Sequence, residues 1–235
     1  FMCLATIVGN VLGNYPLAFR IGETALQLND ILNNRRIYGL VLHIFAFFIQ
    51  HWKKHARHDI EIHRRVFELC LASGDFIYAG HSITANAYCR LVIGHPLQDI
   101  MDELHTYSDF MAGLKDPFIT SQYRSLLDTI ASGSRTEGAG AGTDSRWERE
   151  KSLARLRRQG NLFGLGYLLF AEAMGLYLRG SYEEALAAIQ ELDSSIKVHL
   201  GTLLLHGHYY YYSLILTALL IQGKERLVYH GIASP

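Results

Sequence analysis

Gly180–Ala185 has the sequence Gly-Ser-Tyr-Glu-Glu-Ala, and this short stretch decides the fold class. It lies between two long segments with helical periodicity. A near copy, Gly-Asn-Tyr-Pro-Leu-Ala, occupies Gly13–Ala18, and Gly94–Leu97 has the same layout without the tyrosine. Recurring helix–turn–helix corners of this kind are typical of helical-repeat solenoids. The sequence therefore predicts an all-α protein built from antiparallel helix hairpins.

Three kinds of residue are expected to shape these corners. A glycine ends the first helix because it tolerates the left-handed backbone. An aromatic side chain packs back on that helix, and an alanine three residues later lets the two helices approach closely. These structural corner residues are Gly13, Tyr15 and Ala18, then Gly94, then Gly180, Tyr182 and Ala185. A hairpin cannot bury its own apolar face, so we expect neighbouring hairpins to stack into a superhelical, tetratricopeptide-like solenoid.

Hydrophobic periodicity and capping signals divide the chain into helices. Asp75 and Asp116 are expected N-caps, and two capping boxes are expected, Ser145 with Glu148 and Ser181 with Glu184. Short connections predict antiparallel packing of successive helices. The expected helices cover about 1–12, 15–31, 36–52, 58–73, 76–93, 97–114, a segment from 117, 146–159, 162–179, 182–198 and 202–222.

The helices group into two parts. Residues 1–131 form the first part of the helical-repeat region and residues 146–223 form the second. Between them, residues 132–145 are rich in glycine and serine, which predicts a flexible loop. Residues 224–235 have no strong pattern and are expected to be an irregular tail. The chain begins at Phe1 within a helical pattern, so we expect it to be a fragment of a longer protein.

Composition narrows the classes of partner. Lys and Arg number 22, as do Asp and Glu, so net charge provides no attraction to nucleic acid or to an acidic membrane. The most apolar run, Ile37–Ile49, has too few residues to span a bilayer. Three cysteines without metal-like spacing favour reduced thiols in a cytoplasmic protein. We expect no nucleic-acid partner, no membrane span and no cofactor.

Several segments together resemble one protein family. They occur in the order Gly13–Gly22 with Ala25 and Leu26, Phe48–Trp52, Gly74–Gly80, Gly94–Leu97, Tyr177–Ala185 and His208–Leu214. This series resembles the helical region of large bacterial signalling ATPases of the STAND class. Those proteins join a serine/threonine kinase-like domain, an AAA-type ATPase, this helical region, GAF or PAS sensors and a histidine kinase. The likeness covers about residues 10–220, and the segment after Gly223 departs from it.

The resemblance implies a non-catalytic regulatory and interaction region. Its partner would be a protein segment or a neighbouring domain of the parent chain, and the ATPase and kinase motifs would lie outside this chain. Exposed aromatic residues often anchor protein partners. The candidate partner-binding residues are Trp52, His208, Tyr209 and Tyr212.

Two other functions stay open. His51, His55, His58 and His63 cluster around one turn, which would suit a helical metal-dependent enzyme with a His-rich pocket if the ligands converged. No HExxH spacing accompanies them, and a polar, solvated corner between helices is the simpler interpretation. The other alternative is a ligand-sensing array linked to a DNA-binding output, as in STAND transcription regulators.

Overall fold

The computed structural model of the chain describes residues 1–134 and 143–232. Within these residues the protein is all-helical, and no strand is present. The first half comprises α1 (Met2–Thr6), the π-helical turn η1 (Ile7–Val11), α2 (Tyr15–Ile31), α3 (Arg35–Phe48), the 3-10 turn η2 (Gln50–Trp52), α4 (Arg57–Ser73), α5 (Phe76–Val92), α6 (Leu97–Thr106) and α7 (Ser108–Gly113). The second half comprises α8 (Pro117–Ser134), α9 (Thr143–Gln159), α10 (Leu162–Leu178), α11 (Tyr182–Asp193), the 3-10 turn η3 (Ile196–His199) and α12 (Leu203–Ile232).

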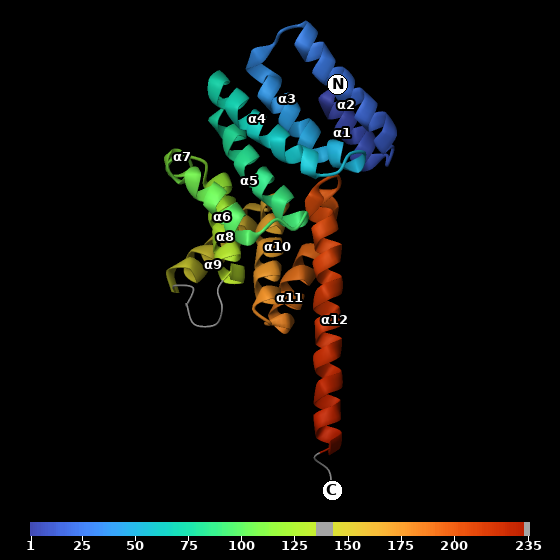
Figure 1. The fold of residues 1–235 in the computed structure, drawn as a ribbon, viewed down its shortest axis with the longest axis vertical. Helices are drawn as coiled ribbons and strands as arrows, with labels where there is room; N and C mark the ends of the chain where they lie inside the picture. Colours follow the sequence, from blue (N-terminus) through green and yellow to red (C-terminus); the bar gives the residue numbers. More distant parts are fainter. Residues whose placement is uncertain (135–142, 233–235) are drawn as a thin grey trace.

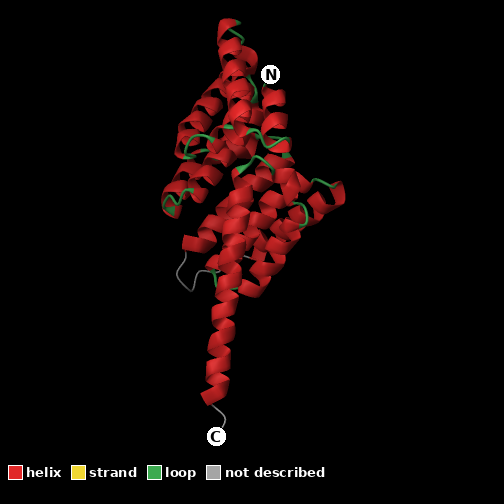
Figure 2. Ribbon diagram, turned by 90° about the vertical axis from the view of Figure 1, so that its right-hand side faces the viewer, coloured by secondary structure: helices red, strands yellow, loops and turns green. Residues whose placement is uncertain are grey.

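Helices that follow one another in the sequence pack side by side. The first four helices lie together at one end of the molecule, and α5 leads from them towards α6–α9 (Figure 1). Next, α10 packs against α11, and α11 packs against α12. The long α12 runs beside this body and continues past its end, as both views show (Figures 1 and 2).

Polar side chains fix where several helices begin. Asn14, Asp75 and Asn161 each accept a hydrogen bond from a backbone N–H of the first turn of α2, α5 and α10. Asp116 accepts two at the start of α8, from the N–H groups of Phe118 and Ile119, both at 2.9 Å. Each cap satisfies backbone donors that the helix itself leaves free. The expected caps at Asp75 and Asp116 are therefore present.

The structure corrects one capping signal and one helix. Ser181 is the N-cap of α11, but its side chain makes no capping hydrogen bond within the described residues, so the expected capping box with Glu184 does not form. The helix expected over 97–114 is divided at Tyr107 into α6 and α7. Near this break the Leu104 carbonyl accepts a hydrogen bond from the Tyr123 hydroxyl at 2.7 Å. This side chain of α8 satisfies a carbonyl at the end of α6, where the helix stops.

Other helix ends also differ from the expected ones. The helix expected over 182–198 ends at Asp193 and is followed by the separate turn η3. Gly223 was expected to end the last helix, yet α12 passes through it to Ile232, so residues 224–232 are helical rather than irregular. Likewise α8 reaches Ser134 and α9 begins at Thr143. The rest of the expected loop, 135–142, and residues 233–235 lie outside the described residues.

The main hydrophobic core extends across both parts of the chain. It runs from Ile83 in α5 to Ile215 in α12 and surrounds α10, where Phe170 is almost fully buried. Accordingly, α10 packs against α8, α9, α11 and α12. A Cβ added at Gly166 of α10 would lie 2.0 Å from His199 Nε2, so glycine permits this close approach. This helix therefore holds the second part of the chain together.

Candidate functional site

The corner glycines all adopt the left-handed conformation. The φ angles of Gly13, Gly94 and Gly180 are 69°, 79° and 78°, and each residue follows the end of a helix or turn. At the third corner the Tyr182 ring lies 5.6 Å from that of Tyr177 in α10, and Ala185 is fully buried. This geometry supplies the turn, the aromatic contact on the preceding helix and the close approach that the sequence pattern describes.

The first corner is built differently around its aromatic residue. Ala18 is buried and a Cβ added at Gly9 would lie 3.0 Å from its Cβ, so η1 and α2 approach closely. Tyr15 packs back on η1, where a Cβ added at Gly9 would lie 3.7 Å from its Cδ1, and its ring also stacks on Trp52 with centroids 4.3 Å apart. The centroid of the Trp52 ring also lies 4.8 Å from that of His206 in α12. Trp52 therefore connects the start of α2 with the start of α12.

The predicted histidine cluster does not converge. His55 and His58 are exposed, whereas His63 is buried and its ring lies 5.6 Å from that of His43. Burial lowers the pKa of His63 to about 3. In the parts of the chain that the structure describes, no group of three or more His, Cys, Asp or Glu side chains is arranged to hold a metal ion.

His51 belongs instead to a buried polar cluster with Gln50 and Asp59. Gln50 Nε2 donates a hydrogen bond to Asp59 Oδ1 at 2.9 Å, and His51 Nδ1 lies 3.9 Å from Asp59 Oδ2. Burial raises the pKa of the Asp59 carboxyl to about 7, against the lowering effect of the Gln50 hydrogen bond. Burial also lowers the pKa of His51 to about 4. This cluster links η2 to the first turn of α4.

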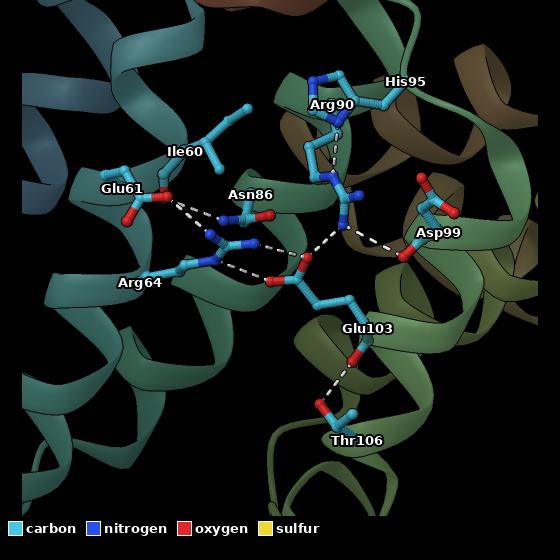
Figure 3. A network of polar contacts seen from close by, with 9 residues as sticks. All are labelled: Ile60, Glu61, Arg64, Asn86, Arg90, His95, Asp99, Glu103 and Thr106. Carbon is cyan, nitrogen blue, oxygen red and sulfur yellow. Dashed lines mark hydrogen bonds and ion pairs between the residues drawn. The ribbon is translucent and has the colours of Figure 1, made fainter.

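A second polar network joins three helices and was not anticipated from the sequence (Figure 3). Glu103 of α6 accepts hydrogen bonds from Arg64 of α4, at 3.1 and 3.2 Å, and from Arg90 Nη1 of α5. The Arg90 residue is 7% exposed, so Glu103 supplies the counter-charge that its buried guanidinium requires. Arg64 and Arg90 are 39 and 13 positions from Glu103, separations that no local pattern reveals.

The other predicted partner-binding residues lie on α12 and face different ways. His208 is fully buried and its Nε2 lies 3.0 Å from Asp193 Oδ1. Tyr212 is half-buried and packs against the main core. Tyr209, in contrast, is 55% exposed. Of these three side chains, Tyr209 has the exposure that contact with a partner requires.

Further apolar side chains share the exposed face of α12 with Tyr209. We call this set the α12 face, and its other members are Tyr210, Leu216, Leu220 and Ile221, all exposed. Leu216 and Leu220 follow Tyr209 by seven and eleven positions, which places them along one stripe of a helix. Of this set only Tyr209 is predicted from the sequence as a partner-binding residue, although the same spacing could have revealed the leucines.

Comparison of the sequence with protein-family models and with curated protein sequences gives no match. Among the described residues, none of the helices combines the length and the apolar character needed to cross a membrane.

Proposed function

We propose that this chain is a non-catalytic helical-repeat scaffold within a larger signal-transduction ATPase or kinase. Its hairpins form a tetratricopeptide-like array that is not strictly linear, because α5 also packs against α8 and α12. The chain binds a helix from a neighbouring domain of the parent chain. The all-helical architecture and the left-handed glycine corners support the repeat arrangement. The resemblance to the helical region of STAND-class signalling ATPases is the basis for the proposed parent protein.

The α12 face is the observation that carries this proposal. Tyr209, Ser213, Leu216 and Leu220 are exposed and follow one another by four, three and four residues. This spacing is the one with which two helices pack along a common seam. Moreover, α12 extends beyond the body, which leaves room for a second helix along the part of α12 that continues past α11 (Figures 1 and 2). A helix with apolar residues at the same spacing is therefore the fitting occupant.

The first experiment determines the coding sequence on both sides of this chain. We expect a P-loop ATPase on the N-terminal side and a kinase or sensor domain on the C-terminal side. Flanking sequence that encodes neither, or that encodes a helix-turn-helix DNA-binding domain, contradicts the proposed parent protein.

The second experiment measures binding of the adjacent domain to this chain by isothermal titration calorimetry. Leu220→Glu places a charge in the seam, and we expect it to weaken binding at least tenfold, about 1.4 kcal/mol. Ile31→Glu is the matched control, because Ile31 is 80% exposed but lies at the end of α2. Equal affinities of the two variants would contradict a binding role for the α12 face, as would a homodimer of this chain that Leu220→Glu dissociates.

A further inference from the structure

A cavity of about 470 Å³ opens between the N-terminal segment and the helices that it covers. Cys3 and Ile7 of α1 and η1 line one side. Side chains of α3 and α5 line another side, and Gln122 of α8 and Phe163 of α10 complete the wall. This volume lies within the roughly 300–1,000 Å³ typical of small-molecule sites. The cavity does not include any residue of the α12 face.

Aromatic rings form much of the cavity wall. His43 stacks on Phe47 with centroids 5.4 Å apart, and its ring meets Tyr78 edge-on at 5.6 Å. On the other side Phe163 lies 5.3 Å from Tyr167, and Phe47 approaches both rings at 6.4 and 6.3 Å. Rings arranged around an open volume favour a planar guest, because offset and edge-on contacts between rings are stabilising.

The cavity carries no formal charge. Among the described residues that line it, none is Asp, Glu, Lys or Arg. Burial lowers the pKa of His43 well below its usual value and also lowers the pKa of His81, so both imidazoles are neutral at pH 7. An ion that entered would lose its hydration without gaining a counter-charge. This lining therefore selects an uncharged guest.

Two polar side chains in the wall make no hydrogen bond with the residues that the structure describes. His43 is 6% exposed, and its Nδ1 makes no hydrogen bond with the described part of the chain. Gln122 is 4% exposed, and its amide makes none within the same residues. For the buried His43 Nδ1 an unmet hydrogen bond costs about 1–3 kcal/mol. Both side chains line the cavity, where a guest could supply the missing bonds.

We propose that this cavity binds an uncharged, ring-bearing small molecule that carries a hydroxyl or carbonyl group. The rings of Phe47, Phe163 and Tyr167 contact its planar body. The polar group of the molecule bonds to the Gln122 amide, which can both donate and accept. This binding is independent of the scaffold function, since the cavity and the α12 face share no residue.

The test compares three probes of similar shape by calorimetry on the whole chain. We expect 2-naphthol to bind with one saturable site. Naphthalene lacks the hydroxyl group and should bind about tenfold more weakly, the equivalent of one hydrogen bond. Naphthalene-2-sulfonate is charged and should bind at least tenfold more weakly than 2-naphthol. Absence of saturable 2-naphthol binding, or equal binding of the sulfonate, overturns the proposal.

Two substitutions test the proposed hydrogen bond and the cavity volume separately. Gln122→Leu should reduce 2-naphthol affinity to that of naphthalene while leaving naphthalene binding unchanged. The same change at the exposed Gln190 of α11 is the matched control and should have no effect. Ala85→Leu fills part of the cavity from α5 and should weaken binding of both probes. Circular dichroism establishes that each variant is folded, and undiminished 2-naphthol binding by Gln122→Leu contradicts the assigned hydrogen bond.

Cys3 provides a test of location on the unaltered chain. Cys3 is exposed and lines the cavity, whereas Cys70 and Cys89 are buried. Burial raises the pKa values of Cys70 and Cys89 to about 11 and about 12, which suppresses their reactive thiolates. We expect saturating 2-naphthol to slow alkylation of Cys3 by N-ethylmaleimide several-fold, and Cys3→Ser to remove the fast-reacting thiol. Alkylation at an unchanged rate would place the bound probe elsewhere and overturn the proposal.

Discussion

At the scale of single residues, the polar groups near η2 behave differently from what the sequence suggests. The sequence places His51, Asp59 and His63 at a solvated corner between helices. In the structure Asp59 is 1% exposed and His63 is 3% exposed. Burial disfavours the charged form of each group, which is why the pKa of Asp59 rises while those of His51 and His63 fall. Periodicity could have revealed the burial of His63, because this residue shares the helical spacing of Ile60, Val66 and Cys70 on the buried face of α4.

The Asp59 carboxyl should make stability depend on pH. In the unfolded chain this carboxyl has a pKa near 3.8, and in the folded chain burial raises the pKa to about 7. The neutral form therefore favours folding below pH 3.8, and this contribution is lost as pH rises towards 7. Asp59→Asn keeps an oxygen for Gln50 but cannot ionise. At pH 8 we expect it to be more stable than the wild type by roughly 2–4 kcal/mol, at about 1.4 kcal/mol per pKa unit.

Urea unfolding at a series of pH values from 4 to 8 measures this difference. Other titrating groups act equally on both proteins, so the difference between them isolates Asp59. It should be close to zero at pH 4 and should grow up to pH 7. A difference that stays constant over the whole range would show that Asp59 ionises normally in the folded protein.

At the scale of helices, the sequence predicts the presence of each helix better than the residues at which the helix begins and ends. The starts at Asp75 and Asp116 and the glycine corners follow local rules, since caps and left-handed glycines act within one turn. At the break near Tyr107 the Leu104 carbonyl accepts a hydrogen bond from Tyr123 of a different helix, a contact that no local rule contains. At Gly223 the sequence predicts a helix end that is absent, since α12 continues to Ile232. A glycine permits a helix to end but does not force it to.

The Glu103 network should hold α4, α5 and α6 together (Figure 3). Glu103→Gln preserves the shape but removes the charge that two arginines share. We expect a loss of about 2–3 kcal/mol of unfolding free energy in urea, since the buried Arg90 keeps its charge without an anionic partner. Glu61→Gln is the matched control, because Glu61 also pairs with Arg64 but its side chain is 75% exposed. Glu61→Gln should lower the free energy of unfolding by no more than about 0.5 kcal/mol. Equal losses in the two variants would contradict a special role for Glu103.

At the scale of the whole molecule, the core connects parts that a linear repeat array would keep apart. In such an array each hairpin contacts only its sequence neighbours. Here α5 packs against α4 and also against α8 and α12. The Tyr88 hydroxyl donates a hydrogen bond to the carbonyl of Tyr167, 79 positions away, at 3.2 Å. The candidate cavity also depends on this arrangement, because residues of α1 and of α10 both line it.

This shared core predicts that the described helices unfold in one transition. Replacing Trp147 by phenylalanine leaves Trp52 as the sole tryptophan, and its fluorescence reports on the contact with Tyr15 and His206. Far-UV circular dichroism reports on all helices at once, so the two signals should give the same urea midpoint. Tyr88→Phe removes the hydrogen bond to α10 and should lower the free energy of unfolding by about 1 kcal/mol. Both midpoints should therefore fall by the same amount. The exposed Tyr210→Phe should change neither, whereas separate midpoints for the two signals would show that the hairpins unfold as independent repeats.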